Sequence, residues 1–336
     1  MADVARFACV SHQTVWRVLN GHRRVREETR ARVLQAINAL GYRRNMTARM
    51  LITGRSRRLG VVSFGSTLLR PASAVYGIER AARDAGCFVS IVSLRTIDRA
   101  GVDEAIGYLA EREVDGVILV APQRLAAQAL ADLLTGLPAV AVGGWHEGDV
   151  SVVTVDQVEG ARQATAHLLD LGHETVWHIS GPDGWLEAEG RSEGWRAALS
   201  AAGRAIPEAL AGDWTPRSGY LAGKILAGRV SDVTAVFAAN DQMALGLLRA
   251  FSEAGVKVPE QVSVVGFDDI PESAFFAPSL TTVRQDFCEV GRLSINVLLE
   301  QVESAEPLGR ARLVVAPRLI CRGSTARARG RSTFIR

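Results

Sequence analysis

The first forty residues alternate apolar and polar positions at the spacing of three short helices. The apolar stripes fall at Val4, Ala5 and Ala8, then at Val15, Val18 and Leu19, and then at Val33, Leu34, Ile37 and Leu40. Ser11 before the second stripe favours a helix start, and Gly41 after the third favours a helix end. Two helices that meet at so short a turn, followed by a third, predict a helix-turn-helix headpiece.

The polar face of the second predicted helix carries side chains that can read DNA base edges or bind phosphates. These candidate DNA-binding residues are His12, Gln13, Arg17 and Asn20. An amphipathic helix pair with a merely solvated polar face would show the same spacing, so the prediction needs independent support.

The distribution of charge supplies that support. Residues 1–58 contain thirteen Arg and no Lys against three acidic residues, which gives a net charge of +10. Residues 59–309 carry a net charge of −15, and residues 310–336 contain eight Arg and no acidic residue. The overall charge of +3 therefore hides a basic head on an acidic body. Double-stranded DNA, with about one negative charge per 1.7 Å of helix axis, is the partner that this asymmetry favours.

Beyond residue 58 the pattern changes to short β-branched runs that alternate with helical stretches. These runs are Leu59–Phe64, Cys87–Val92, Val114–Val120, Pro138–Val142, Thr175–Ile179, Ala235–Ala239 and Val262–Phe267. Such runs predict buried parallel strands, so the fold class is α/β with two doubly wound subdomains after the headpiece. Residues 312–321 alternate like a single late strand.

Several classes of protein are disfavoured. No apolar run reaches the eighteen or so residues of a membrane span, and the start of the chain does not resemble a signal peptide, so we expect a cytoplasmic protein without membrane contact. Four scattered cysteines suggest neither a metal site nor a disulfide framework. The chain lacks Gly-x-Gly-x-x-Gly after its first predicted strand, and it lacks the common hydrolase and metalloprotease motifs. We therefore expect no catalytic residue, no cofactor and no enzyme.

The order of these segments resembles the lactose/galactose repressor family of bacterial transcription regulators. The hinge pattern of that family, Asn-x-x-Ala-Arg-x-Leu, is matched by Asn45, Ala48, Arg49 and Leu51, and the resemblance extends from residue 3 to about residue 323. It implies a hinge that folds only on DNA and inserts Leu51 into the minor groove.

The resemblance also implies a domain organisation. Residues 1–44 form the DNA-binding headpiece, residues 45–58 form the hinge helix and linker, and residues 59–323 form the effector-binding core. The N-subdomain of this core comprises about 59–156 and 286–316, and the C-subdomain comprises about 157–285 with the chain end. We expect a disordered basic tail over 324–336.

Effector-binding residues follow from the same resemblance, because segments 239–246, 264–269 and 280–287 are similar to those of lactose-repressor-type members. The resemblance implies that Arg191, Asn240 and Asp268 bond sugar hydroxyls, while Trp214, Gln285 and Phe287 line the pocket. On the N-subdomain, the residues expected to complete the wall are Phe64, Leu68 and Trp145.

The chemistry of these side chains leaves some alternatives open. Arg191 alone would suit a carboxylate ligand, and an aspartate after a strand is often only a helix cap. Arg191 together with Asn240, Asp268 and Trp214 favours a sugar or glycoside, because a hydroxyl both donates and accepts. Gly143 stands where lactose-repressor-type members have an aspartate, so the sugar is not identified.

The expected function is repression of carbohydrate genes by a homodimer that binds a pseudo-palindromic operator and is released by its sugar. A regulator that its ligand tightens on DNA is the alternative. A solute-binding protein would share the fold of the core but would not carry a basic headpiece. In that headpiece, Cys9 occupies a turn position usually held by Gly in the family, and Trp16 replaces a small Ser.

Overall fold

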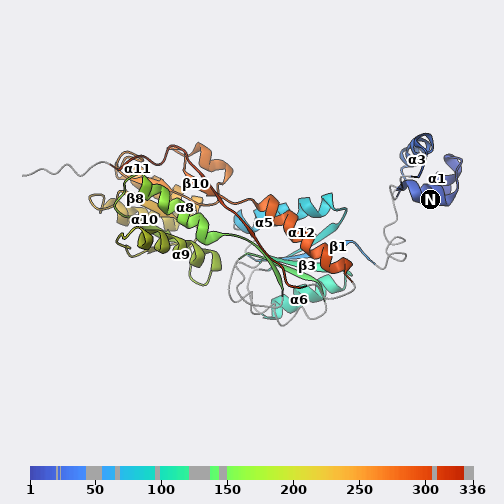
Figure 1. The fold of residues 1–336 in the computed structure, drawn as a ribbon, viewed down its shortest axis with the longest axis horizontal. Helices are drawn as coiled ribbons and strands as arrows, with labels where there is room; N and C mark the ends of the chain where they lie inside the picture. Colours follow the sequence, from blue (N-terminus) through green and yellow to red (C-terminus); the bar gives the residue numbers. More distant parts are fainter. Residues whose placement is uncertain are drawn as a thin grey trace, which may run out of the picture. The chain divides into compact units, whose positions relative to one another are not determined.

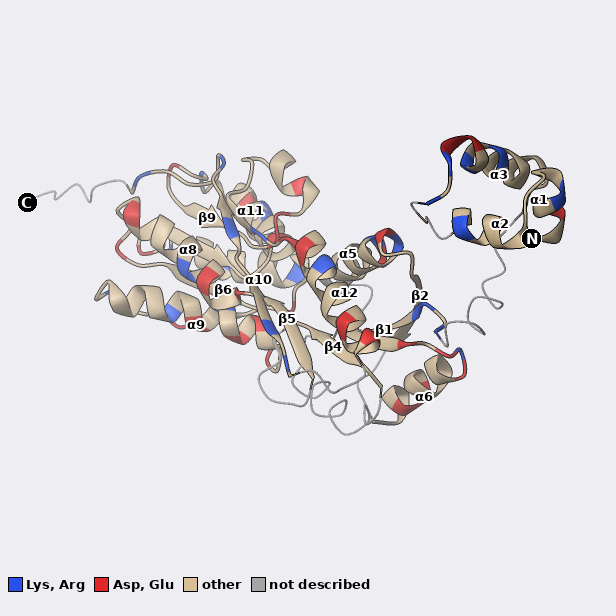
Figure 2. Ribbon diagram, turned by 45° about the vertical axis from the view of Figure 1, so that its right-hand side comes forward, with Lys and Arg blue, Asp and Glu red and all other residues tan. Residues whose placement is uncertain are grey.

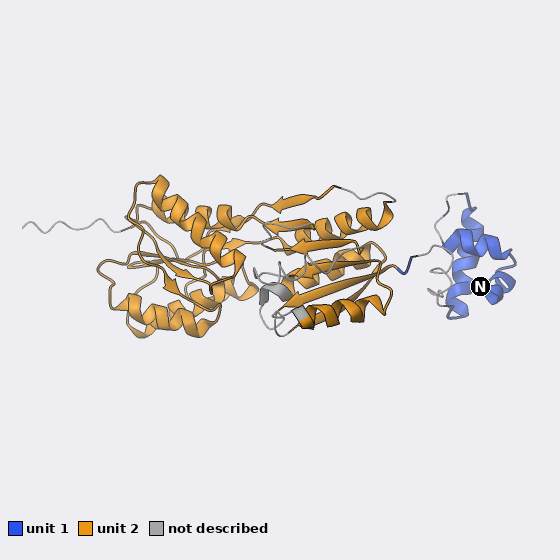
Figure 3. Cartoon of the chain, turned by 90° about the horizontal axis from the view of Figure 1, so that it is seen from below, with its two compact units in different colours: residues 1–56 blue, residues 57–336 orange. Residues whose placement is uncertain are grey.

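The computed structural model describes residues 1–19, 22, 24–42, 55–64, 69–94, 99–120, 137–143, 150–304 and 309–328. The chain divides into two compact units, Met1–Ser56 and Arg57–Arg336 (Figure 3). Each unit has its own hydrophobic core.

The first unit contains three helices, α1 (Ala2–Phe7), α2 (His12–Leu19) and α3 (Glu27–Ala39). Its core consists of Val4, Ala5, Ala8, Val15, Val18, Val33 and Ala36. The Ser11 hydroxyl accepts a hydrogen bond from the Thr14 amide at 3.2 Å, and this bond caps the start of α2. Two residues of the third apolar stripe lie outside this core, because Leu34 and Leu40 are 48% and 43% exposed. The short helices α1 and α2 cover only the narrow stripe of α3 that contains Val33.

The second unit begins with a six-stranded parallel sheet in the order β11-β5-β4-β3-β1-β2. Its strands are β1 (Arg58–Phe64), β2 (Phe88–Leu94), β3 (Gly116–Val120), β4 (Ala139–Val142), β5 (Ser151–Val155) and β11 (Arg312–Val315). Alternate residues of a strand point to opposite faces, and both faces of this sheet are covered. Leu59 and Val61 pack under α5 (Leu69–Asp84) and α12 (Phe287–Glu303), whereas Val62 packs under α6 (Arg99–Ala110) (Figure 1).

A second parallel sheet has the order β7-β6-β8-β9. Its strands are β6 (Trp177–Ser180), β7 (Leu210–Ala211), β8 (Ala235–Ala238) and β9 (Ser263–Val265). Its flanking helices are α8 (Gln157–Asp170) and α9 (Leu186–Ala201) on one face, and α10 (Pro216–Ala227) and α11 (Asp241–Glu253) on the other. Phe237 faces the first pair and Val236 the second. The predicted fold of two doubly wound α/β subdomains is confirmed.

The chain crosses between these subdomains three times. It passes from β5 to α8, from β10 (Thr282–Arg284) to α12, and from β11 to β12 (Arg318–Ile320). Strands β10 and β12 pair antiparallel beside the second sheet. The prediction of one strand over 312–321 is therefore wrong, because Pro317 separates two strands that belong to different sheets.

The predicted disordered tail is wrong for its first residues, 324–328. Ser324 is fully buried, and its hydroxyl donates to the Val264 carbonyl at 2.6 Å. The amide of Ala328 donates to the Leu171 carbonyl at 2.9 Å. Most side chains of residues 324–328 are small, so this segment of the predicted basic tail can pack against the second subdomain. The remaining residues of the predicted tail, 329–336, lie outside the described residues.

Candidate functional site

The polar face of α2 is the candidate DNA-reading surface. Val15 and Val18 are buried against the rest of the headpiece, and His12, Gln13 and Arg17 are exposed. Gln13 and Arg17 lie four residues apart, so both side chains project from one face of the helix. Outside the described residues lie Asn20 and the predicted hinge residues Asn45, Ala48, Arg49 and Leu51.

The turn before α2 contains Cys9, where the resemblance to the lactose/galactose repressor family implies glycine. Cys9 has a φ of 51°, in the left-handed region that favours glycine. Trp16 is 42% exposed on α2, and the centroid of its ring lies 5.5 Å from that of His22. The reading surface therefore includes a large aromatic side chain beside its polar groups.

Arginine outnumbers the acidic residues in the first unit as a whole, although its helices carry residues of both charges, as Figure 2 shows. Asp3 lies 3.8 Å from Arg6, and Glu27 lies 3.7 Å from Arg30. Two of the three acidic residues in the headpiece thus lie beside an arginine. The many arginines that remain give the headpiece a net positive charge that favours binding to a polyanion.

A buried ion pair is the centre of a polar site in the second subdomain. Arg191 on α9 donates to the Asp268 carboxylate at 3.1 Å, and these side chains are 0% and 3% exposed. The guanidinium also donates to the Gln157 side chain at 2.9 Å and to the Ala239 carbonyl. The same Asp268 oxygen accepts from Gln285 Nε2 at 2.7 Å. The two charges of the pair therefore balance. Each side chain also makes a further hydrogen bond, Arg191 to Gln157 and Asp268 with Gln285.

Asn240 and Trp214 lie beside this pair. Asn240 follows β8 and caps α11, since its Oδ1 accepts from the Met243 amide at 2.9 Å. Its Nδ2 donates to the Trp214 carbonyl at 3.0 Å. The Trp214 ring is 5% exposed and lies 5.4 Å from the Arg191 guanidinium carbon. Its buried indole N–H has no hydrogen-bond partner among the described residues, so it can donate to a ligand oxygen.

Two further residues of this site were missing from the sequence prediction. Gln157 donates to Gln285 Oε1 at 2.8 Å and accepts from Arg191, so it joins two predicted residues. It follows β5, and the rule of a polar residue after an apolar strand would have found it had that strand been recognised. Trp185 lies just before α9 with its ring centroid 5.9 Å from that of Trp214, edge to face. No comparable signal marks Trp185 in the sequence.

Asp241, the first residue of α11, is buried close to the ion pair. Its carboxylate accepts from the Ile270 amide at 2.9 Å and from the Thr282 hydroxyl at 2.6 Å. Burial, and then the nearby Asp268 carboxylate, raise the pKa of Asp241 well above its ordinary value. A Cβ atom at Gly266 would lie 2.2 Å from Asp241 Oδ1, so only glycine fits there.

The structure places the remaining predicted effector residues elsewhere or leaves them outside its described part. Phe64 belongs to the core under α6. Phe287 packs against the opposite face of the first sheet, where it lines a groove with Ala72, Tyr76 and also Gln285, a residue of the polar site. Leu68 and Trp145 lie outside the described residues. The polar group therefore unites Arg191, Trp214, Asn240, Asp268 and Gln285.

Other kinds of site find no support in the part of the chain that the structure describes. There, no group of three His, Cys, Asp or Glu side chains is placed to hold a metal ion. No described helix is long and apolar enough to cross a membrane. Cys87 is buried, and Cys9, Cys288 and Cys321 are exposed free thiols.

Comparisons with known proteins agree with this picture. Residues 1–45 match the bacterial regulatory proteins of the lacI family, and residues 165–325 match the periplasmic binding protein-like domain. The transcriptional regulator CelR of Thermobifida fusca is 38% identical, with 96% of each chain covered. The ribose operon repressor of Escherichia coli K12 is 33% identical, with 96% of this chain and 99% of that protein covered.

Solved structures show the same relationship. The lac repressor bound to ONPG superposes with a TM-score of 0.80 at 30% identity, covering 96% of this chain and 98% of that one. A CelR–cellobiose complex superposes with a TM-score of 0.71 at 34% identity and the same coverage. The chain therefore belongs to the LacI family of bacterial regulatory proteins, a family of DNA-binding transcription regulators and not of enzymes.

Proposed function

We propose that this protein is a cytoplasmic repressor of carbohydrate-utilisation genes that binds a pseudo-palindromic operator as a homodimer and is released by a neutral sugar. The exposed face of α2 and the excess of arginine in the first unit support operator binding. Two-fold symmetry would place two such helices in neighbouring major grooves. In this proposal Asn20 joins the reading face, and the segment from Asn45 to Leu51 forms the hinge on DNA.

The charge-balanced ion pair is the observation that favours a neutral sugar. A carboxylate ligand would meet a guanidinium already paired with Asp268 at 3.1 Å, and the Asp268 carboxylate would repel it. A hydroxyl can accept from Arg191 and donate to Asp268 at once. The buried Trp214 indole adds a donor and an apolar face. Among the relatives, CelR is solved with cellobiose, which is a neutral sugar of this kind.

The proposed pocket has two walls. In the second subdomain, Arg191, Asn240 and Asp268 form hydrogen bonds with the sugar hydroxyls. Trp214 and Gln285 lie beside these three residues. The first subdomain supplies Leu68, Trp145 and Phe287, whereas Phe64, which is buried in the core under α6, is not part of the proposed wall. A sugar that contacts both subdomains binds one relative arrangement of the subdomains more tightly than another. Only this difference in sugar affinity can change operator binding.

Thermal shift against a panel of neutral and acidic sugars, including cellobiose, ribose and glucuronate, tests the ligand class. We expect a neutral sugar to raise the melting temperature and glucuronate to leave it unchanged. A larger shift with glucuronate than with any neutral sugar would contradict the proposal.

Operator affinity with and without the best sugar tests the site. Wild type should release the operator, whereas Asp268→Asn should bind the operator normally and ignore the sugar, because the substitution removes the charged acceptor. Asp232→Asn, an exposed substitution in the same subdomain, is the control and should respond like wild type. Release of the Asp268→Asn variant at the wild-type sugar concentration would show that the pocket is elsewhere. If the sugar instead tightened operator binding by wild type, the ligand would act as a corepressor and not as an inducer.

A further inference from the structure

Asp268 and Asp269 both hold backbone conformations that favour glycine. Their φ angles are 111° and 50°, and the first lies beyond the small left-handed region that aspartate tolerates. In this conformation Asp268 presents its carboxylate to Arg191 and Gln285. Contacts around the dipeptide must therefore hold it in place if the carboxylate is to remain in the effector site.

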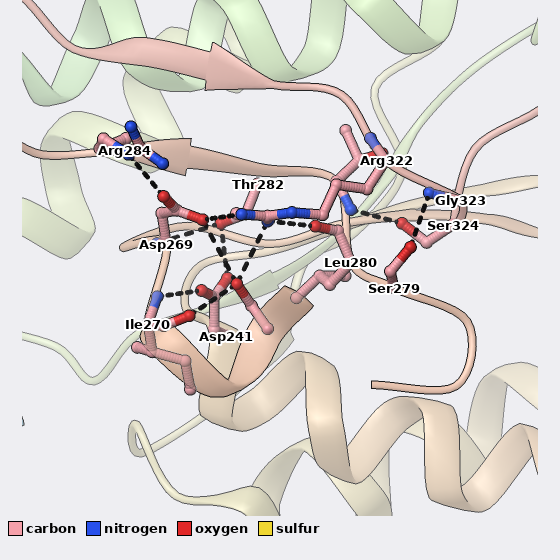
Figure 4. A network of polar contacts seen from close by, with 12 residues as sticks. Asp241, Asp269, Ile270, Ser279, Leu280, Thr282, Arg284, Arg322, Gly323 and Ser324 are labelled. Atoms are coloured by element: carbon pink, nitrogen blue, oxygen red, sulfur yellow. Dashed lines mark hydrogen bonds and ion pairs between the residues drawn. The ribbon is translucent and has the colours of Figure 1, made fainter. Parts of the chain in front are cut away.

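Asp269 is held by two arginines from different segments (Figure 4). Arg322 donates to one carboxylate oxygen at 2.6 Å, and Arg284 donates to the other at 2.6 Å. The Arg322 side chain is 18% exposed, compared with 51% for Arg284, so Arg322 is the better enclosed partner. Burial alone would raise the pKa of Asp269, but the two guanidinium groups outweigh it and hold this pKa below its usual value.

Arg322 also fixes the segment that follows Asp269. Its guanidinium donates to the Leu280 carbonyl at 2.7 Å and to the Ser273 hydroxyl at 3.2 Å. Its backbone amide donates to the Thr281 hydroxyl at 2.9 Å. One residue thus joins Asp269, which precedes the 3₁₀-helix Pro271–Phe275, to Ser273 inside that helix and to the segment beyond it.

We propose that Arg322 is a positioning residue of the effector site, which acts on the ligand through Asp269 and Asp268. Arg322 follows β12, just after the third crossing between the subdomains. Strand β12 pairs with β10, which leads directly to Gln285, a second partner of Asp268. Arg322 thereby connects the third crossing to the Asp268 carboxylate, with which the sugar would form a hydrogen bond. The identity of the ligand rests on the proposed function, whereas the hold on Asp268 does not.

Hydrogen exchange of the ligand-free, full-length protein tests this hold directly. The Asp268 amide donates to the Val283 carbonyl at 2.8 Å, and the Ile270 amide donates to Asp241 at 2.9 Å. In Arg322→Met we expect residues 266–272 to exchange about tenfold faster, with β6 unchanged, because the better enclosed of the two arginines that hold Asp269 is gone. Arg322→Lys should restore part of the protection. Unchanged exchange of 266–272 in Arg322→Met would overturn the proposal, whatever the ligand is.

The matched control is Arg249→Met, which breaks an exposed ion pair with Glu253 in the same subdomain. It removes the same type of side chain and should leave exchange of 266–272 at the wild-type rate. Equal acceleration in both methionine variants would mean a general loosening of the subdomain, and would also overturn the proposal.

Calorimetric titration with cellobiose tests the consequence for binding. Arg322→Met should weaken cellobiose about tenfold and Arg322→Lys less, with sugar-free operator affinity within about twofold of wild type. Wild-type cellobiose affinity in Arg322→Met would overturn the role in binding. If wild type binds no panel sugar, the proposed function fails, and the exchange result still decides the positioning role.

Discussion

The fully buried His178 contributes to the pH dependence of the stability of the second unit. His178 in β6 is fully buried and packs against the rings of Phe237 and Trp195, with centroid distances of 4.8 and 5.0 Å. Burial lowers its pKa to about 3, although a hydrogen bond to the Phe237 carbonyl opposes this. The unfolded chain, with a histidine pKa of about 6.5, therefore binds a proton more readily than the folded chain.

The stability contributed by neutral His178 is present above pH 6.5 and is lost as pH falls towards 3. We expect this residue to lower the free energy of unfolding by up to about 1.4 kcal/mol per pH unit in that window. His178→Gln keeps a donor for the Phe237 carbonyl but cannot titrate, so its urea midpoint should fall less between pH 7 and pH 5. His22→Gln, at an exposed position, is the control. Parallel curves for His178→Gln and wild type would contradict this prediction.

The residues of the effector site differ in how visible they are in the sequence. Asn240 and Asp268 stand directly after apolar strands, and the ends of neighbouring parallel strands meet at one edge of a sheet. Arg191 could be predicted as a site residue only from the family resemblance, because no local sequence feature distinguishes it from other arginines on a helix. The bond between Gln157 and Gln285 joins residues 128 positions apart. Such a contact depends on how the crossings are arranged, which no local pattern shows.

At the scale of elements, the contact between α5 and α12 depends on two glycines. A Cβ atom at Gly77 would lie 2.1 Å from the Phe287 carbonyl oxygen, and one at Gly291 would lie 2.2 Å from the Gly77 carbonyl carbon. The clashing atoms are backbone, so a side chain cannot simply rotate away. We expect Gly291→Ala to lower the free energy of unfolding by about 2 kcal/mol, since overpacking typically costs 1–3 kcal/mol.

Gly107 in α6 is the matched control, because nothing lies within 4 Å of its Cβ position. Gly107→Ala should raise the free energy of unfolding by about 0.5–1 kcal/mol through the lower entropy of the unfolded chain. Urea unfolding followed by far-ultraviolet circular dichroism measures both variants. Equal effects of the two substitutions would show that the helices separate to accept the new methyl group.

Strands β1, β3, β4 and β8 were predictable because both of their faces are buried, which produces continuous β-branched runs. The edge strand β2 was also recognised from its apolar run, but the prediction that it is buried is wrong, because Phe88 and Ile91 are exposed. The prediction missed β5, β7 and β10, of which the last two have only two and three residues. Strands β11 and β12 share one alternating pattern, but their partners lie in different sheets. Pairing is decided by tertiary contacts, so the pattern alone could not divide them.

At the scale of the whole molecule, the chain combines two binding functions of opposite electrostatic character. The first 58 residues carry a net charge of +10, whereas the proposed sugar site is built on a buried, charge-balanced pair. Coupling between operator and sugar must be reciprocal, so the operator should weaken sugar binding by the same factor that sugar weakens operator binding.

Salt should therefore separate the two binding reactions. Operator binding releases counterions from many phosphates, so we expect its affinity to fall by about a thousandfold or more between 50 and 200 mM salt. Binding of a neutral sugar to the free dimer should change less than about twofold, because a buried pair is screened much less than exposed charges. Fluorescence anisotropy with labelled operator and calorimetric titration with the best panel sugar measure the two affinities. A parallel fall of both affinities would mean that the effector is an anion, and that Asp268 is not its partner.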